Sequence, residues 1–200
     1  MNAICKKQTK SDVFNCARRL IHMDRCKKLI KRRILSVILF AFALYLAEFS
    51  PFSGRAVALI NGGYGTFDMK KYDADVFVSV MNATSNASIY WKYYLCDFIF
   101  TAAFLNFMIQ MVWGFKGEPI NKVKVLSYFL AVIRGMLDVT ENIILLNQIY
   151  SYPEINRMLI DACNIITRIK FHLMRGWIAC FVIMLIIQIL SNRKAKEKRQ

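Results

Sequence analysis

The sequence predicts an all-α, polytopic membrane protein built as a bundle of four transmembrane helices, and three observations lead to this prediction. Hydrophobic residues make up 56% of the chain and come in long runs, whereas soluble domains carry them as amphipathic stripes. Four runs come close to or exceed the roughly 20 residues that a helix needs to cross a bilayer. Basic residues are concentrated beside these runs, as is typical of cytosolic flanks.

The four predicted spans differ in character. The first is the shortest, the second begins with an aromatic belt and ends at Trp113, the third carries charges in its middle, and the fourth is polar at first and then almost pure hydrocarbon. Tyrosine and tryptophan at the ends of a span are typical of a membrane interface. The predicted spans are 30–49, 93–113, 125–150 and 162–190.

Charge divides the chain and predicts its topology. Residues 1–33 carry eleven basic against two acidic residues, a net of +9, and residues 191–200 carry five against one, a net of +4. The loop 114–124 has a net charge of +2, whereas the segment 50–91 has none. Because basic flanks stay in the cytosol, we expect a cytosolic arm at 1–33, a transmembrane domain at 34–190 and a cytosolic tail at 191–200, with 50–91 outside.

The basic ends indicate the lipid bilayer and its anionic headgroups as partners. A nucleic-acid partner is not predicted, because the basic residues flank spans and no nucleic-acid-binding motif occurs. Two interpretations of the arm stay open, a helix on the inner membrane surface and a solvated basic tail. In the outer segment, the apolar stretch 75–81 is too short to span and is expected as a helix or strand packed over the bundle. Asn82 and Asn86 begin glycosylation sequons.

The third span holds four polar side chains that a transmembrane helix ordinarily lacks. Arg134 and Asp138 are four residues apart, and Asp138 is three and four residues from Glu141 and Asn142, so all four share one helical face. Ionisable groups at membrane depth are costly and usually face a bundle interior or a water-filled cavity. This face is therefore the predicted binding or relay site.

Depth counted from the outer ends aligns further residues with this site. Glu141 lies nine residues before Tyr150, and Lys170 lies nine residues after Asp161 on the antiparallel fourth span. Both are thus expected roughly 13 Å from the outer face, at about 1.5 Å per residue. Lys170 is predicted to pair with Asp138 and Glu141, since a partner lowers the cost of burying a charge.

Thr167 and Asp97 complete the predicted site, together with a supporting role for Asn142. Asn142 and Thr167 are expected to supply hydrogen bonds, because Thr167 and Lys170 are three residues apart on one face. Asp97 is expected about two turns closer to the outer face than Asp138. A buried ion pair that only fixes helix register is the structural alternative.

A secondary polar group is predicted nearer the cytoplasm. Asn106 and Gln110 share a face of the second span, nearly opposite Asp97, and Arg134 and Arg175 fall at a similar depth. Either amide is expected to bond one of the arginines, with snorkelling of the guanidinium as the alternative. No histidine pair has metal-ligand spacing, and no catalytic or nucleotide-binding motif occurs, so neither a metal nor a cofactor is predicted.

The pattern Asp138-x-x-Glu141-Asn142, then Tyr152-Pro153, then Thr167-x-x-Lys170, resembles small, largely uncharacterised four-helix membrane proteins. The resemblance covers about residues 93–172 and implies no known activity. It is consistent with a multi-pass membrane location with both termini cytosolic.

Three functions follow as alternatives. The first is a membrane protein whose outward-facing polar pocket binds or relays a proton, a small cation or a lipid headgroup. The second is a membrane-embedded enzyme acting on lipid, with Asp138 or Glu141 as general base and Lys170 as electrostatic stabiliser. The third is a structural subunit of an oligomer or membrane complex.

Overall fold

The computed structural model describes residues 10–197, and it describes side chains from residue 27 onward except at 69 and 194–196. Within these limits the chain consists of six α-helices and one short 3-10 helix, without a strand. The predicted all-α class is therefore confirmed for the described part of the chain.

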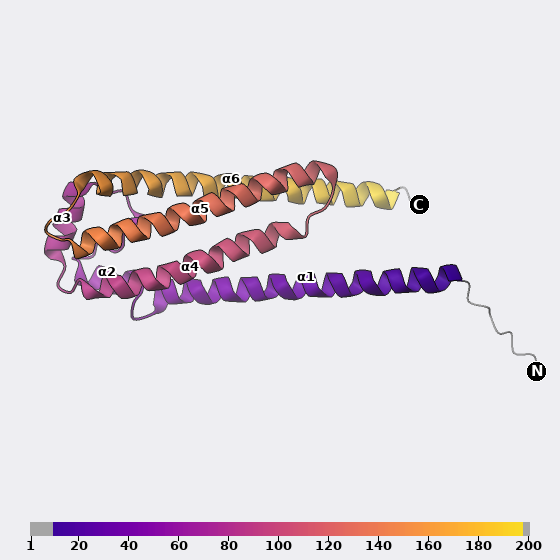
Figure 1. Ribbon diagram of the computed structural model, residues 1–200, viewed down its shortest axis with the longest axis horizontal. Helices are drawn as coiled ribbons and strands as arrows, with labels where there is room; N and C mark the ends of the chain where they lie inside the picture. The colour runs from indigo at the N-terminus through magenta and orange to yellow at the C-terminus, as the bar shows by residue number, and fades with distance from the viewer. Residues whose placement is uncertain (1–9, 198–200) are drawn as a thin grey trace, which may run out of the picture.

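Four long helices form the body of the molecule (Figure 1). Helix α1 packs against α4, α4 packs against α5, and α5 packs against α6. The two helices in the middle of this order, α4 and α5, are thus enclosed on both sides. The long helices are α1 (Lys10–Phe49), α4 (Ser88–Trp113), α5 (Glu118–Tyr150) and α6 (Arg157–Glu197).

The two ends of the helices differ (Figure 1). At one end, which we call the capped end, lie α2 (Gly54–Ile60), η1 (Phe67–Met69) and α3 (Ala74–Ala83). At the other, which we call the open end, lie the connection between α4 and α5 and the ends of α1 and α6 that lead to the two termini. The sequence predicts a helix or a strand for the apolar stretch 75–81, and this stretch is helical, as part of α3. Helix α3 packs against α6.

Local interactions explain how the cap folds. Ser53 and Asp73 are N-caps whose side chains accept hydrogen bonds from the backbone N–H groups of Ala56 and Val76. Between these helices the Asn61 side chain accepts from Gly65 N at 3.0 Å and donates to Gly65 O at 2.7 Å. Gly65 has a φ of 87°, a left-handed conformation that glycine adopts readily.

Three helices, α1, α4 and α6, are long and apolar enough to cross a membrane. Helix α5 is long enough, with 33 residues, but its charges keep it out of this class. The sequence predicts four spans, and composition alone supports three among the described residues.

Helix boundaries extend beyond the predicted ones. The backbone of α1 continues from Lys10 through the predicted arm boundary at residue 33 without a break, because no proline or glycine interrupts it. Helix α5 begins at Glu118 and has Pro119 in its first turn. Proline is tolerated there because its missing N–H has no partner within the helix in any case. Residues 1–9 of the predicted arm lie outside the described residues.

Candidate charged site

Helix α5 has a polar face turned inward and an apolar face turned outward. Arg134, Asp138, Glu141 and Asn142 are all buried, with exposed fractions of 8% or less. On the opposite face, apolar side chains at helical spacing form an exposed stripe, and the exposed fraction of Met136, for example, is 65%. The stripe comprises Val125, Phe129, Val132, Met136, Val139 and Ile143. This arrangement is the reverse of an amphipathic helix on the surface of a soluble protein.

Lys170 joins the two buried carboxylates of α5, as the depth alignment predicts. Its Nζ lies 2.6 Å from Oδ1 of Asp138 and 2.5 Å from Oε2 of Glu141. All three side chains are 5% exposed or less. The predicted pairing is therefore confirmed, and its geometry combines ion pairs with hydrogen bonds.

Two threonine hydroxyls engage the remaining oxygens of these carboxylates. Thr167 of α6 donates to Oε1 of Glu141, as the predicted supporting role requires. Thr101 of α4 donates to Oδ2 of Asp138 at 2.5 Å and was not among the predicted residues. Its spacing of four from Asp97 is the sequence signal that identifies it, since both lie on one face of α4.

Asp97 extends the site toward the capped end. Asn142 Nδ2 donates to Oδ2 of Asp97 at 2.5 Å, so the predicted supporting amide serves Asp97. Beyond Asp97, the hydroxyl of Tyr93 lies 3.0 and 3.1 Å from the two carboxylate oxygens of Asp68 in η1. Asp68 is also buried, and the sequence offers no periodic signal for it because it stands in a loop-like segment.

The predicted secondary polar group does not assemble, and its members take other partners. Asn106 Nδ2 donates to Oγ of Ser36 at 3.2 Å, because α1 packs on that face of α4. Gln110 contributes its backbone carbonyl, which accepts from Nε of Arg33 at 3.4 Å. Arg175 is exposed on α6. The prediction that Asn106 or Gln110 bonds an arginine side chain of α5 or α6 is wrong.

Arg134 instead belongs to the charged site. Its NH2 lies 3.5 Å from Oδ2 of Asp138, and its guanidinium carbon lies 4.4 Å from the ring centroid of Phe104. The ring face supplies a cation–π contact in a desolvated setting. We define the charged cluster as Asp97, Arg134, Asp138, Glu141 and Lys170.

The charged cluster holds more acidic than basic groups. Three carboxylates face two cations, which leaves one negative charge in excess when all five groups are ionised. An uncompensated charge in a buried site is costly, and it favours uptake of a proton or another cation.

Several buried polar atoms at the site lack a protein partner among the described atoms. They include NH1 of Arg134, Oδ1 of Asn142 and the hydroxyls of Tyr72 and Tyr94. Such atoms usually bind water or the polar groups of a ligand. Burial raises the pKa of Tyr72, which lies in the cap near Glu141, so its hydroxyl stays neutral. Among the described residues, no group of three or more His, Cys, Asp or Glu is placed to hold a metal ion.

A cavity of about 190 Å³ opens beside the charged cluster. Thr167, whose hydroxyl binds Glu141, is one of its walls. The cavity is lined by Lys70, Lys71, Asn164, Thr167, Arg168 and Phe171. The cavity therefore adjoins a residue that contacts Glu141, while Glu141 itself is fully buried.

No protein-family model matches this chain, and neither a curated protein nor a solved structure matches it. The resemblance of the Asp138–Lys170 pattern to small four-helix membrane proteins stays a prediction.

Proposed function

We propose that the chain is an integral membrane protein with four spans, in which α5 crosses the membrane together with α1, α4 and α6. The support is the outward apolar stripe of α5 opposite its buried charges. Lipid tails surround a spanning helix with hydrocarbon, so its polar groups turn toward the other helices. Water outside the bundle would favour the opposite orientation.

We further propose that the open end faces the cytosol. The start of α1 and the end of α6 both lie at that end (Figure 1), as an even number of spans requires. The basic flanks at residues 27–33 and in the α4–α5 connection lie there too, and basic flanks remain cytosolic. The capped end is then the outer end.

Within this frame, the charged cluster is proposed to bind a proton that it exchanges with the outer side. The observation that carries this proposal is Lys170 shared between Asp138 and Glu141 while Asp97 adds a third carboxylate. A proton removes the excess negative charge without needing new ligands. A small metal cation needs about six oxygen ligands from protein and water, whereas most carboxylate oxygens of the cluster are already engaged by Lys170, threonine and asparagine.

The exchange is proposed to occur from one side. Toward the capped end, the carboxylates of Asp97 in α4 and Asp68 in η1 lie within electrostatic range of each other. Tyr93, on the same helix as Asp97, donates a hydrogen bond to Asp68. Toward the open end, the core is built from apolar residues. They are Met108, Val112, Ile120, Ala131, Trp177 and Met184. Since an apolar cluster also lies at the capped end, the proposed direction rests on the buried acidic residues Asp97 and Asp68, which continue from the charged cluster toward that end.

A second candidate function is an enzyme acting on an anionic lipid, with Asp138 or Glu141 as general base and Lys170 as electrostatic stabiliser. The cavity beside Thr167 favours it, because Lys70, Lys71 and Arg168 line that cavity and attract an anionic headgroup. Turnover of anionic lipid by the purified chain, lost in Glu141→Gln, supports this candidate over the first.

Infrared spectroscopy tests the proton site. In the purified chain at neutral pH we expect a band from a protonated carboxyl group. Asp97→Asn or Glu141→Gln removes this band, since each deletes the excess acid. The matched control, Glu118→Gln, changes an exposed acidic residue at the start of α5 and leaves the band unchanged. A parent spectrum without the band contradicts the proposal.

Cysteine labelling tests the topology separately. In a background with the six native cysteines replaced, Lys70→Cys reports the capped end and Lys116→Cys the open end. An impermeant maleimide added to intact cells is expected to label the first and spare the second. Labelling of the second alone reverses the assignment of outer and inner ends.

A further inference from the structure

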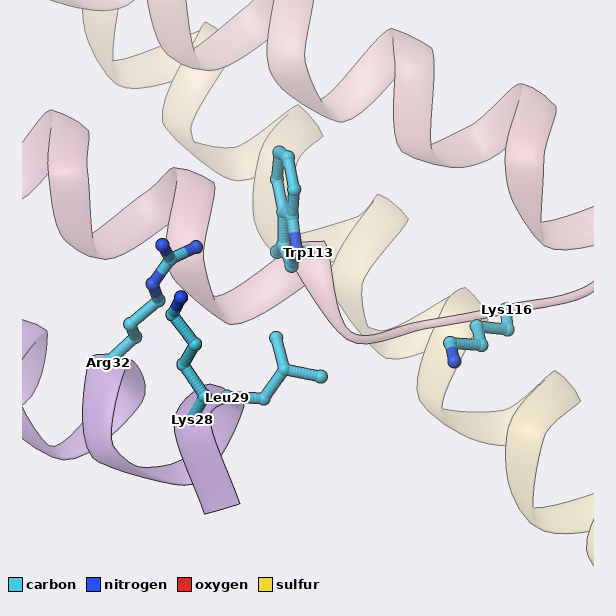
Figure 2. A pocket seen from close by; sticks show the side chains of 5 residues that line it. All are labelled: Lys28, Leu29, Arg32, Trp113 and Lys116. Atoms are coloured by element: carbon cyan, nitrogen blue, oxygen red, sulfur yellow. The ribbon is translucent and has the colours of Figure 1, made fainter. Parts of the chain in front are cut away.

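A second cavity lies at the open end, where α1 runs past the last residue of α4 (Figures 1 and 2). Its volume is about 280 Å³. Three of its walls come from α1, one from the end of α4 and one from the connection that follows. They are Lys28, Leu29, Arg32, Trp113 and Lys116.

Three of these five side chains are cations from two separate parts of the chain. Lys28 and Arg32 are four residues apart on α1, and Figure 2 shows their charged ends side by side next to the end of α4. Lys116 lines the cavity from the α4–α5 connection, and its charged end lies apart from those of Lys28 and Arg32, with Leu29 between them in the view. Like charges at this spacing repel each other, so the arrangement becomes favourable when an anion lies among them.

Other cations already satisfy the carbonyl groups at the end of α4. Arg33 NH2 donates to the carbonyl of Met111 at 3.2 Å, and Lys124 Nζ donates to the carbonyls of Trp113 and Phe115 at 2.9 and 3.1 Å. The cavity cations are therefore not needed to cap this helix. Among the described side chains, the ion pairs involve other residues than Lys28, Arg32 and Lys116.

The remaining walls are apolar. Trp113 is 50% exposed at the end of an apolar helix, where tryptophan typically lies at a membrane interface. Leu29 extends from α1 toward the connection (Figure 2). A cationic group beside an indole and a leucine matches a molecule with a phosphate head and a hydrocarbon body.

We propose that this cavity binds the phosphate group of an anionic phospholipid from the leaflet at the open end. Lys28 and Arg32 contact the phosphate oxygens, Lys116 adds positive charge from the connection, and Trp113 and Leu29 contact the glycerol and the first acyl carbons. Three cations favour a phosphate monoester, which carries more negative charge than a diester. The assignment to the inner leaflet rests on the proposed topology, whereas binding itself does not.

Native mass spectrometry of the full chain in detergent tests this site, with phosphatidic acid, phosphatidylglycerol and phosphatidylcholine as probes. We expect binding to weaken in that order. The double variant Lys28→Gln/Arg32→Gln is expected to weaken phosphatidic acid binding about 25-fold, from about fivefold per basic residue. Equal binding of phosphatidylcholine and phosphatidic acid overturns the proposal.

A matched control separates the site from general attraction to charge. Lys27 and Lys31 are exposed on α1 at the same spacing but do not line the cavity. Lys27→Gln/Lys31→Gln removes the same charge and is expected to change the affinity less than threefold. Equal losses in both double variants overturn the proposal. The charge-conserving variant Lys28→Arg/Arg32→Lys retains binding, which guards against a folding defect.

Competition distinguishes the two sources of a phosphate monoester. Glycerol 3-phosphate supplies the phosphate without acyl chains, and we expect millimolar concentrations to leave bound phosphatidic acid in place. Displacement at micromolar concentrations assigns the site to a soluble phosphate and overturns the lipid source. Neither result depends on the infrared band or on maleimide labelling, so this inference and the proposed function fail separately.

Discussion

The capped half and the open half of the helix bundle differ in what they bury beside their apolar cores. The capped half has a large apolar cluster from α2, η1, α3 and the adjoining ends of α4, α5 and α6, yet charged groups are also buried there. In the capped half, ion pairs and hydrogen bonds link α4, α5 and α6 through Asp97, Asp138 and Lys170. In the open half, the buried polar side chains among the described residues are uncharged, such as Ser36 and Ser127, the rest of the core is apolar, and basic residues line a cavity at the end of α4. The same helices therefore hold charge at one level and exclude it at another.

This difference indicates that the charges serve more than helix register. A register device needs one polar pair, because a single buried polar contact suffices to fix alignment. The capped half instead gathers five ionisable groups with a cavity beside them. An apolar core in the open half shows that these helices pack without such groups at that level.

The largest expected effect is the loss of the shared cation. Lys170→Met strands Asp138 and Glu141 beside each other and is expected to lower the free energy of unfolding by about 3–5 kcal/mol. The melting temperature in detergent should fall accordingly. Adding Asp138→Asn and Glu141→Gln is expected to recover much of the loss. If the single variant melts at the same temperature as the parent, Lys170 does not stabilise the two buried carboxylates.

The corresponding change in the open half is Met184→Ala. Met184 is fully buried on α6, about four turns from Lys170. Truncation leaves a cavity and is expected to cost about 2–4 kcal/mol in detergent unfolding. It should leave the infrared carboxyl band unchanged, since no charged group changes, whereas Lys170→Met removes a cation and should strengthen the band. A lost band shows that the two halves are coupled.

A smaller effect is expected where the cap joins the capped half. Tyr93→Phe removes the hydroxyl that donates to Asp68 and leaves a buried carboxylate short of a donor. The expected loss is about 1–2 kcal/mol in the free energy of unfolding. Tyr93→Phe combined with Asp68→Asn should cost less than the single change, because a neutral amide needs fewer donors. Equal losses contradict this coupling.

Hydropathy and spacing predict the long helices and much of the charged site. Glu141 and Lys170 could be aligned because α5 ends and α6 begins at the same end of the bundle, and both helices share one rise per residue. Asp68 and Tyr93 could not be paired, since the cap has no repeating pattern that fixes where η1 lies. Asn106 was assigned to the wrong partner because the sequence does not state which helix packs beside α4.

The cavity at the open end escapes sequence analysis for a related reason. Lys28 and Lys116 are far apart in the chain. They line one cavity only because α1 passes the end of α4 (Figure 2). Basic flanks predict attraction to lipid in general. They do not predict which cations converge.

The smallest expected effect concerns Tyr72, whose buried hydroxyl has no hydrogen-bond partner among the described atoms. Tyr72→Phe is therefore expected to change the free energy of unfolding by less than about 0.5 kcal/mol near neutral pH. Burial raises the folded-state pKa of Tyr72 above its ordinary value of 10.0, so the folded state keeps this proton longer than the unfolded state does.

The contribution of this raised pKa to the free energy of unfolding is thus fully present below about pH 10. It declines as the pH rises past the pKa of the tyrosine in the unfolded state. The phenylalanine variant lacks this group and should lose less stability between about pH 9 and pH 11. Detergent unfolding at the two pH values measures the difference. Because Tyr64 in the same cap also has a raised pKa, some decline is expected to remain in the variant. Identical declines in parent and variant mean that the Tyr72 hydroxyl is hydrated, and that water reaches the cap side of Glu141.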